Sequence, residues 1–321
     1  MYPCSENNNN ERIGNMEKLR KIALLTDSCA DLAAETAREN NIYVVPLRIL
    51  CSDGEYRDGV DITSRDIYAR LEGGELPKTS LPSKEDVTRT LDKIAADGFD
   101  SVIAVMLSGG LSGTFNLLRL VAQERDDLCI RVFDSLSGSL GQEMILLQLA
   151  QEIKNGAEWE YLVEERVTQL IKNTFPFFSV DTLEYLRKGG RIGNITAVAG
   201  ALLQIKPVIS FGENGQLRTA AKVRGQRHVA QKLVELTQSL SGEGRKYNLA
   251  VANGGLPEEM ARLRKMLTEA LPKYSSIWSG EIGGKLSIKS NGCFIHLKLV
   301  YKKILKSFKH NILRSSAKSA A

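Results

Sequence analysis

Short apolar runs rich in β-branched residues alternate with segments of helical periodicity through the first half of the chain. The apolar runs are IALL at 22–25, IYVVPLRI at 42–49, VIAVML at 102–107 and CIRVF at 129–133. Helical periodicity fills 31–39, 84–96, 113–125 and 139–154. Strands separated by helices pair in parallel through right-handed crossovers. The alternation therefore predicts an α/β fold with a parallel sheet.

The second half of the chain predicts another α/β domain. Its clearest element is the hairpin PVISFGENGQLRTAAKV, in which Gly-Glu-Asn-Gly forms the turn between two strands. Helices are expected at about 160–173, 195–204, 226–240 and 257–270, with strands at 177–180 and 247–252. We expect a disordered segment at 1–20, an N-terminal α/β domain at 21–165, a C-terminal α/β domain at 166–290 and a basic tail at 291–321.

The net charge of +5 belongs to the C-terminal tail. From Lys285 to Ala321 there are nine Lys and Arg and no acidic residue, and removing them from the 43 basic residues leaves 34 against 38 acidic ones. The remainder gives no electrostatic reason to expect nucleic acid as a partner. No apolar run is long enough to span a membrane. Five cysteines without a CxxC pair favour reduced thiols and a cytoplasmic protein without structural zinc.

A bare, hydroxyl-rich loop follows the apolar run 102–107. Its sequence, SGGLSGT, carries the hydroxyls of Ser108, Ser112 and Thr114 and stands just before a predicted helix. Hydroxyls and free N–H groups at a helix N-terminus suit a carboxylate or phosphate; the alternative is a tight turn in which Ser112 caps the helix. KTSLPS at 78–83 is a second such turn, and EYLRKGGRIGN at 184–194 adds Arg191.

Enzyme chemistry remains an open alternative. SGGLSGT matches neither a P-loop nor a dinucleotide fingerprint, and no His, Cys and carboxylate cluster suggests a metal. Asp27 ends the first predicted strand, where it either caps a helix or lines the crevice that binds ligands in open α/β sheets. A small-molecule transferase or hydrolase that uses Asp27 or Ser112 is therefore the second hypothesis. The apolar helix at 195–204 either walls a tunnel or is plain core.

Several motifs in sequence order resemble the DegV family, the fatty-acid-binding group that includes the FakB subunits of bacterial fatty acid kinase. They are LLTDSCADL, YRDGVDIT, KTSLPS, LSGGLSGTF, VFDSLSGSLG, SVDTLEYLRKGGRI and LLQIKPVI, between about residues 21 and 288. The resemblance implies a two-domain α/β protein with one long-chain fatty acid between the domains.

By motif position, the resemblance makes Thr79 and Ser112 the ligands of the fatty acid carboxylate. Arg191 and Arg224 match basic positions linked to presenting the carboxylate, and Asp27, Ser108 and Thr114 are further candidates from the residues themselves. A separate ATP-dependent kinase subunit is expected to form the acyl phosphate for phospholipid synthesis. The chain would then be a carrier with no catalytic residue, metal or cofactor, and the fatty acid would be its ligand.

The C-terminus departs from the family pattern. The family closes on a stretch whose histidine reaches the carboxylate, whereas this chain reads KLSIKSNGCF with Lys289 near that place. From Leu297 to Ile312, apolar residues recur at helical spacing with lysines between them. This pattern predicts a basic amphipathic helix that contacts a membrane transiently, unless the tail is accidental sequence.

Overall fold

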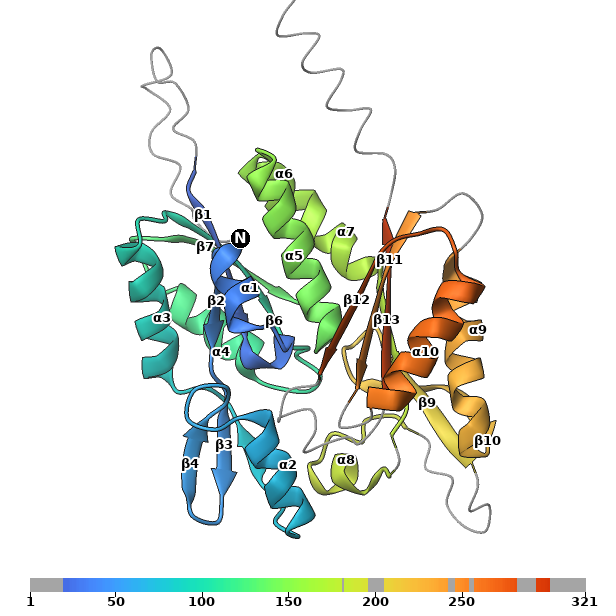
Figure 1. The fold of residues 1–321 in the computed structure, drawn as a ribbon. Helices are drawn as coiled ribbons and strands as arrows, with labels where there is room; N and C mark the ends of the chain where they lie inside the picture. Colours follow the sequence, from blue (N-terminus) through green and yellow to red (C-terminus); the bar gives the residue numbers. More distant parts are fainter. Residues whose placement is uncertain are drawn as a thin grey trace, which may run out of the picture.

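The computed structural model describes residues 20–180, 182–195, 205–241, 246–253, 257–281 and 293–300 (Figure 1). A parallel sheet in the order β2-β1-β6-β7 forms the centre of the first lobe. Its strands are β1 (Ile22–Asp27), β2 (Ile42–Val45), β6 (Ser101–Met106) and β7 (Cys129–Asp134). The predicted α/β class and parallel sheet are therefore confirmed.

Helices cover both faces of this sheet, as the unbroken burial of β1 and β6 requires. Alternate residues of β1 point to opposite layers, so that Leu24 packs with α5 and Leu25 packs with α3 and α4. The helices are α1 (Ala34–Glu39), α3 (Lys84–Ala96), α4 (Thr114–Ala122) and α5 (Leu140–Lys154). The helical periods expected at 31–39, 84–96, 113–125 and 139–154 correspond to these four.

A small antiparallel sheet in the order β4-β3-β5 stands below the parallel sheet (Figure 1). It consists of β3 (Arg48–Cys51), β4 (Gly54–Arg57) and β5 (Lys78–Ser80), and α2 (Ser64–Glu72) belongs to the same part. The run 42–49 was expected as one strand, but the chain leaves β2 at Val45 and begins β3 at Arg48, with Pro46 between them. Proline has no backbone N–H to donate to a β-ladder.

The second lobe is built on a six-stranded mixed sheet in the order β10-β9-β8-β13-β11-β12. The strands are β8 (Thr174–Phe178), β9 (Ile205–Phe211), β10 (Leu217–Arg224), β11 (Lys246–Asn253), β12 (Tyr274–Glu281) and β13 (Cys293–Val300). β9 and β10 form the predicted hairpin. One face packs against α9 (Val229–Ser241) and α10 (Pro257–Ala270), where Leu233 and Leu263 meet Leu249.

Short helical segments connect the two lobes and their sheets. The chain between β7 and β8 continues from α5 through α6 (Trp159–Tyr161), a π-helical turn η2 (Leu162–Arg166) and α7 (Val167–Lys172). Single turns η1 (Ser28–Ala30), α8 (Glu184–Lys188) and η3 (Gln226–His228) complete the described elements. None of the helices in the described residues has the length and apolar character needed to cross a bilayer.

One expectation from the sequence is wrong. The amphipathic helix expected from Leu297 onward is a strand as far as Val300, because β13 inserts between β8 and β11 and pairs antiparallel with both. The tail beyond Val300, the segment 1–19 and most of the helix expected at 195–204 lie outside the described residues, and membrane contact by the tail stays a prediction.

Candidate functional site

The loop after β6 folds into a compact turn that presents hydroxyls at the start of α4. The N–H of Ser112 donates to the Ser108 carbonyl at 3.1 Å. The hydroxyls of Ser112 and Thr114 lie 2.8 Å apart. The N-cap residue Gly113 has no side chain, and the first N–H of the helix, that of Thr114, donates to the Ser112 hydroxyl at 3.4 Å, so Ser112 partly caps α4. Two polar hydroxyls and the positive end of a nine-residue helix therefore converge at one place.

The second hydroxyl-rich turn adjoins this place. A Cβ added at Gly113 would lie 3.5 Å from both methyl carbons of Leu81, the residue that follows β5. Thr79 is the middle residue of β5, half-buried and paired with Ile49 of β3. KTSLPS was expected as a turn throughout, but its first three residues form a strand and only 81–83 turn. The structure thus brings the two predicted turns together.

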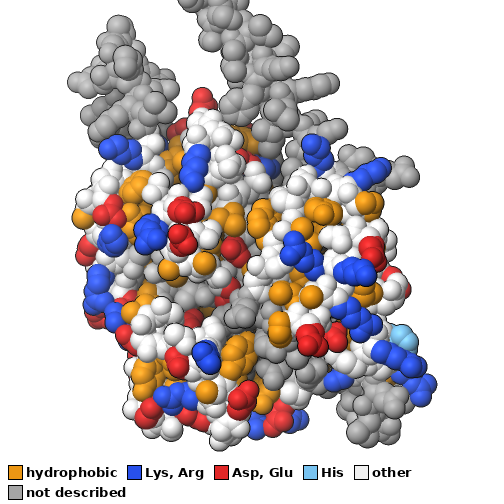
Figure 2. All heavy atoms as spheres, viewed as in Figure 1, with side chains coloured by type: hydrophobic (Ala, Val, Ile, Leu, Met, Phe, Trp, Pro, Cys, Tyr) orange, Lys and Arg blue, Asp and Glu red, His pale blue; other side chains and the backbone are white. Residues whose placement is uncertain are grey.

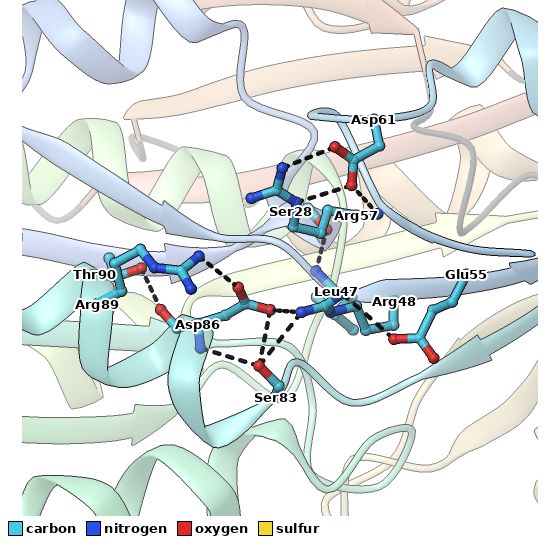
Figure 3. Close-up of polar contacts among 10 residues, drawn as sticks. All are labelled: Ser28, Leu47, Arg48, Glu55, Arg57, Asp61, Ser83, Asp86, Arg89 and Thr90. Atoms are coloured by element: carbon cyan, nitrogen blue, oxygen red, sulfur yellow. Dashed lines mark hydrogen bonds and ion pairs between the residues drawn. The ribbon is translucent and has the colours of Figure 1, made fainter.

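A charged network fastens the small sheet, and with it Thr79, to α3 (Figure 3). Arg48 of β3 forms an ion pair with the buried carboxylate of Asp86. The Ser83 hydroxyl donates to the same carboxylate at 3.0 Å and caps α3 by accepting the Asp86 N–H at 3.1 Å. Arg89 pairs with the other carboxylate oxygen at 3.3 Å. This network fixes the turn 81–83 that lies beside Gly113.

Arg191 reaches the same loop from the second lobe. Its Nε donates to the Leu111 carbonyl at 3.2 Å, and its Nη1 donates to the Gly189 carbonyl at 2.5 Å. Leu111 directly precedes Ser112, so the guanidinium is anchored to the backbone one residue away from the hydroxyl pair. Arg191 is half-buried, which strengthens its attraction for an anion relative to a fully exposed cation.

Ser108 joins the two lobes. Its hydroxyl is fully buried and donates to the Gly215 carbonyl in the β9–β10 turn at 2.7 Å. The same oxygen accepts the Gly110 N–H at 3.3 Å. We expected this hydroxyl to face a ligand, but its hydrogen bonds hold the loop against the second lobe. Ser108 therefore positions Ser112 rather than contacting an anion beside it.

Two strand-end aspartates shape the loop from behind. Asp27 is fully buried, and its carboxylate accepts the Cys29 N–H at 3.0 Å and the Leu107 N–H at 2.7 Å. These bonds favour the capping interpretation of Asp27. Asp134 accepts the Leu136 N–H at 2.9 Å and the Gly109 N–H at 3.0 Å. Asp134 was not among the predicted site residues, although it ends a strand and precedes Ser135, just as Asp27 ends a strand and precedes Ser28.

Arg224 stands apart from the other candidates. It ends β10, whereas the start of that strand adjoins the loop: a Cβ on Gly110 would lie 2.5 Å from the nitrogen of Gln216, the residue before Leu217. At about 3.3 Å per residue, the seven steps from Leu217 to Arg224 span roughly 23 Å. The structure therefore does not bring Arg224 to Ser112.

An apolar cluster fills the space between the lobes behind the loop. The first lobe contributes Leu107, Leu111 and Met144, and the second contributes Phe178 and Ile209. Its other buried members are Cys29, Leu47, Leu140, Val180, Leu186, Ile195, Leu217, Ala250 and Ala252. Ile195 is the one residue of the expected apolar helix 195–204 that the structure describes, and it is buried here.

An ionisable side chain is next in sequence to members of this apolar cluster. Glu143 is in the first turn of α5, between Leu140 and Met144 of the apolar cluster. Burial away from water raises the pKa of its carboxyl to about 7. In the part of the chain that the structure describes, no three His, Cys, Asp or Glu side chains gather in a way that could hold a metal ion.

The comparisons with known proteins agree on one family. The model of the DegV family of uncharacterised proteins matches residues 21–290. A DegV domain-containing protein of Clostridium acetobutylicum is 37% identical over 264 residues, which cover 82% of this chain and 93% of that protein. A DegV domain-containing protein of Clostridium perfringens is 38% identical over 241 residues, or 75% of this chain and 85% of that protein.

Solved structures of similar fold have names that mention fatty acids. A DegV family protein of Thermus thermophilus, described by its fatty acid binding, has a TM-score of 0.80 at 30% identity and covers 87% of this chain and 100% of its own. The fatty acid binding protein DegV of Bacillus subtilis has a TM-score of 0.79 at 26% identity, over 88% and 100% of the two chains. A stearic acid-binding protein of Eubacterium ventriosum has a TM-score of 0.77 at 26% identity, over 87% and 98%.

Proposed function

The chain belongs to the DegV family, and from this premise we propose that it is a carrier that binds one long-chain fatty acid between its lobes and presents the carboxylate to a separate kinase subunit. The observation that carries the proposal is the meeting of a hydroxyl pair, an N-terminal helix end and an apolar cluster at one loop. The fatty acids bound by the solved relatives support it.

The carboxylate end is assigned to the loop at α4. Within the Ser112–Thr114 pair one hydroxyl donates to the other, and the second donates its hydrogen to the carboxylate. Thr79 approaches from the adjoining strand, and Arg191 supplies positive charge. Hydrogen bonds to an ionised acceptor are shorter and stronger than neutral ones, and the helix end adds a favourable field. Ser108, Asp27 and Asp134 hold this loop in place through the bonds described above.

The hydrocarbon end accounts for most of the affinity. Burying about 16 carbons at roughly 0.8 kcal/mol per CH₂ gives on the order of 10 kcal/mol before the entropy of association is subtracted. The apolar cluster between the lobes, with Leu107, Leu111 and Phe178, provides the matching environment. The hydroxyl contacts then fix the orientation of the carboxylate more than they determine whether the lipid stays bound.

A separate kinase subunit is proposed to carry out the phosphorylation of the bound fatty acid. We assign the transfer of phosphate to a separate ATP-dependent subunit that meets the carboxylate at the loop; the sequence itself carries no P-loop motif. The product is an acyl phosphate, an activated acid for phospholipid synthesis. We assign the carrier to the cytoplasm, where such a kinase finds its ATP.

Alanine variants separate retention of the lipid from its transfer. Ser112→Ala and Thr79→Ala should keep close to one fatty acid per chain in native mass spectrometry, yet form acyl phosphate about tenfold more slowly with the kinase subunit. Ser275→Ala, an exposed serine on β12, is the matched control and should behave as the parent chain. If both site variants lose the lipid while transfer per bound lipid is normal, the roles are reversed.

The hydrolase or transferase alternative is less well supported. Both oxygens of Asp27 accept backbone N–H groups in a fully buried place, which leaves no open approach to a substrate. The side-chain partner of Ser112 is the hydroxyl of Thr114, which is not a base. Turnover of an ester or acyl substrate by the purified chain alone, abolished by Ser112→Ala, would favour the alternative.

A further inference from the structure

A basic pocket of about 990 Å³ lies where β10 ends and α9 begins. Figure 2 shows Lys and Arg side chains gathered over this part of the second lobe, at the lower right. The ionisable side chains that line the pocket are mostly positive: Lys206, Lys222, Arg224, Arg227, His228 and Lys232. Among the described lining residues Glu235 is the one acid, and it pairs with Lys232 at 3.0 Å.

The backbone of the pocket is a fixed turn. Gly225 has a φ of +81°, a left-handed conformation that glycine adopts without a steric penalty. The turn brings His228 back so that its Nδ1 donates to the Arg224 carbonyl at 2.9 Å. Lys222 and Arg224 are two residues apart on β10 and so share a face of the strand. Arg227 follows on η3, so cations from strand and turn border one hollow.

Three of the cations that line the pocket have no acidic partner among the described residues. Within the described residues, Lys222, Arg224 and Arg227 are exposed, and none of them forms an ion pair. The 13-residue helix α9 begins at Val229 with no acidic residue in its first turn, so its positive end adds to the same field. An alternative explanation is that lysine on the edge strand β10 prevents pairing with another strand. That role would not require two arginines and a histidine held by a hydrogen bond around the same pocket.

We propose that this pocket binds a phosphate-bearing anion at a site separate from the fatty acid. Arginine matches phosphate oxygens with two parallel N–H bonds, and several cations around one hollow favour a ligand with several negative charges over a single carboxylate. The roughly 23 Å of strand between Leu217 and Arg224 keeps this ligand away from Ser112. The phosphate belongs either to a soluble phosphate compound or to a phospholipid head group.

Titration of the full chain, loaded with its fatty acid, with inorganic pyrophosphate tests the site. We expect one binding event per chain that weakens as salt is raised. The double variant Lys222→Gln/Arg227→Gln should weaken binding by about tenfold or more. Arg65→Gln/Lys172→Gln removes two exposed charges from the first lobe and from α7, and should change the affinity less than about twofold. Circular dichroism checks that both variants are folded.

Flotation with vesicles of phosphatidylcholine and phosphatidylglycerol identifies the source of the phosphate. Vesicle binding that Lys222→Gln/Arg227→Gln abolishes would assign the site to a head group, and pyrophosphate binding alone would assign it to a soluble compound. The proposal is overturned if the parent chain binds neither probe, if the double variant binds both as the parent does, or if polyglutamate binds where pyrophosphate does not. Normal fatty acid content in the double variant keeps this result independent of the proposed carrier function.

Discussion

Replacing Gly110 by alanine should separate the loop from the β9–β10 turn. A Cβ at this position would lie 2.5 Å from the Gln216 nitrogen and 2.6 Å from the Gly215 oxygen, and ordinary contact begins at 3.4 Å. Both neighbours are backbone atoms, so no side chain can swing aside. The two lobes must therefore move apart by about 1 Å at this contact.

The expected loss of stability follows from that displacement. The buried hydrogen bond from the Ser108 hydroxyl to the Gly215 carbonyl, now 2.7 Å, would stretch beyond 3.5 Å. A buried donor that loses its partner costs about 1–3 kcal/mol, and the strain that remains in the packed interface adds about 1 kcal/mol or more. We expect the free energy of unfolding to fall by roughly 2–4 kcal/mol.

Urea unfolding followed by tryptophan fluorescence measures this change, and native mass spectrometry measures the fatty acid that remains bound. Gly113→Ala is the matched control, because its Cβ would lie at an ordinary 3.5 Å from the flexible Leu81 side chain. It should lower the free energy of unfolding by less than about 1 kcal/mol. If Gly110→Ala unfolds as the control does and keeps its lipid equally well, the contact between the loop and the β9–β10 turn does not hold the lobes together.

Three further predictions concern polar side chains that are buried or half-buried. Burial raises the pKa of Glu143 from 4.5 to about 7, so between these pH values the folded chain holds a proton that the unfolded chain releases. The free energy of unfolding should therefore decrease from pH 4.5 to 7. Glu143→Gln should flatten that part of the pH profile of urea unfolding. Asp134→Asn keeps one of the two carboxylate oxygens, so either the Gly109 N–H or the Leu136 N–H loses its acceptor. The free energy of unfolding in urea should fall by about 1–2 kcal/mol, and acyl phosphate formation should slow. Arg166 is buried and pairs with Glu152 at 2.6 Å. Arg166→Met leaves the Glu152 carboxylate without its partner and should lower the free energy of unfolding by about 3 kcal/mol. An unchanged urea midpoint would show that water takes the place of the arginine.

The alternation of apolar runs and helical periods was sufficient to predict the parallel sheet. β1 and β6 are buried on both faces, and such strands read as continuous apolar runs that are easily recognised. The small sheet was missed because β4 and β5 are only four and three residues long and largely exposed. β5 exists because Ile49 and its neighbours in β3 offer a pairing edge, which a local pattern cannot show.

The same distinction between local sequence signals and long-range contacts applies to the candidate site. Ser112 and Thr114 were found because they follow one strand and open one helix, which is a local signal. That Leu81 of the second turn lies against Gly113, and that Ser108 bonds Gly215 across the lobes, depends on contacts between residues far apart in sequence. For Arg224 the local motif was misleading. The motif suggested a place near the carboxylate, but the length of β10 separates Arg224 from the loop.

The carboxyl carbon of the bound lipid tests the central claim most directly. The chain is loaded with palmitate labelled with ¹³C at the carboxyl group, and its resonance is recorded in the parent, Ser112→Ala and Ser275→Ala chains. We predict one bound resonance, distinct from free palmitate, that moves in Ser112→Ala and stays in place in Ser275→Ala. A chain that shows no bound resonance, or one that is identical in all three proteins, would contradict the placement of a fatty acid carboxylate at the loop before α4.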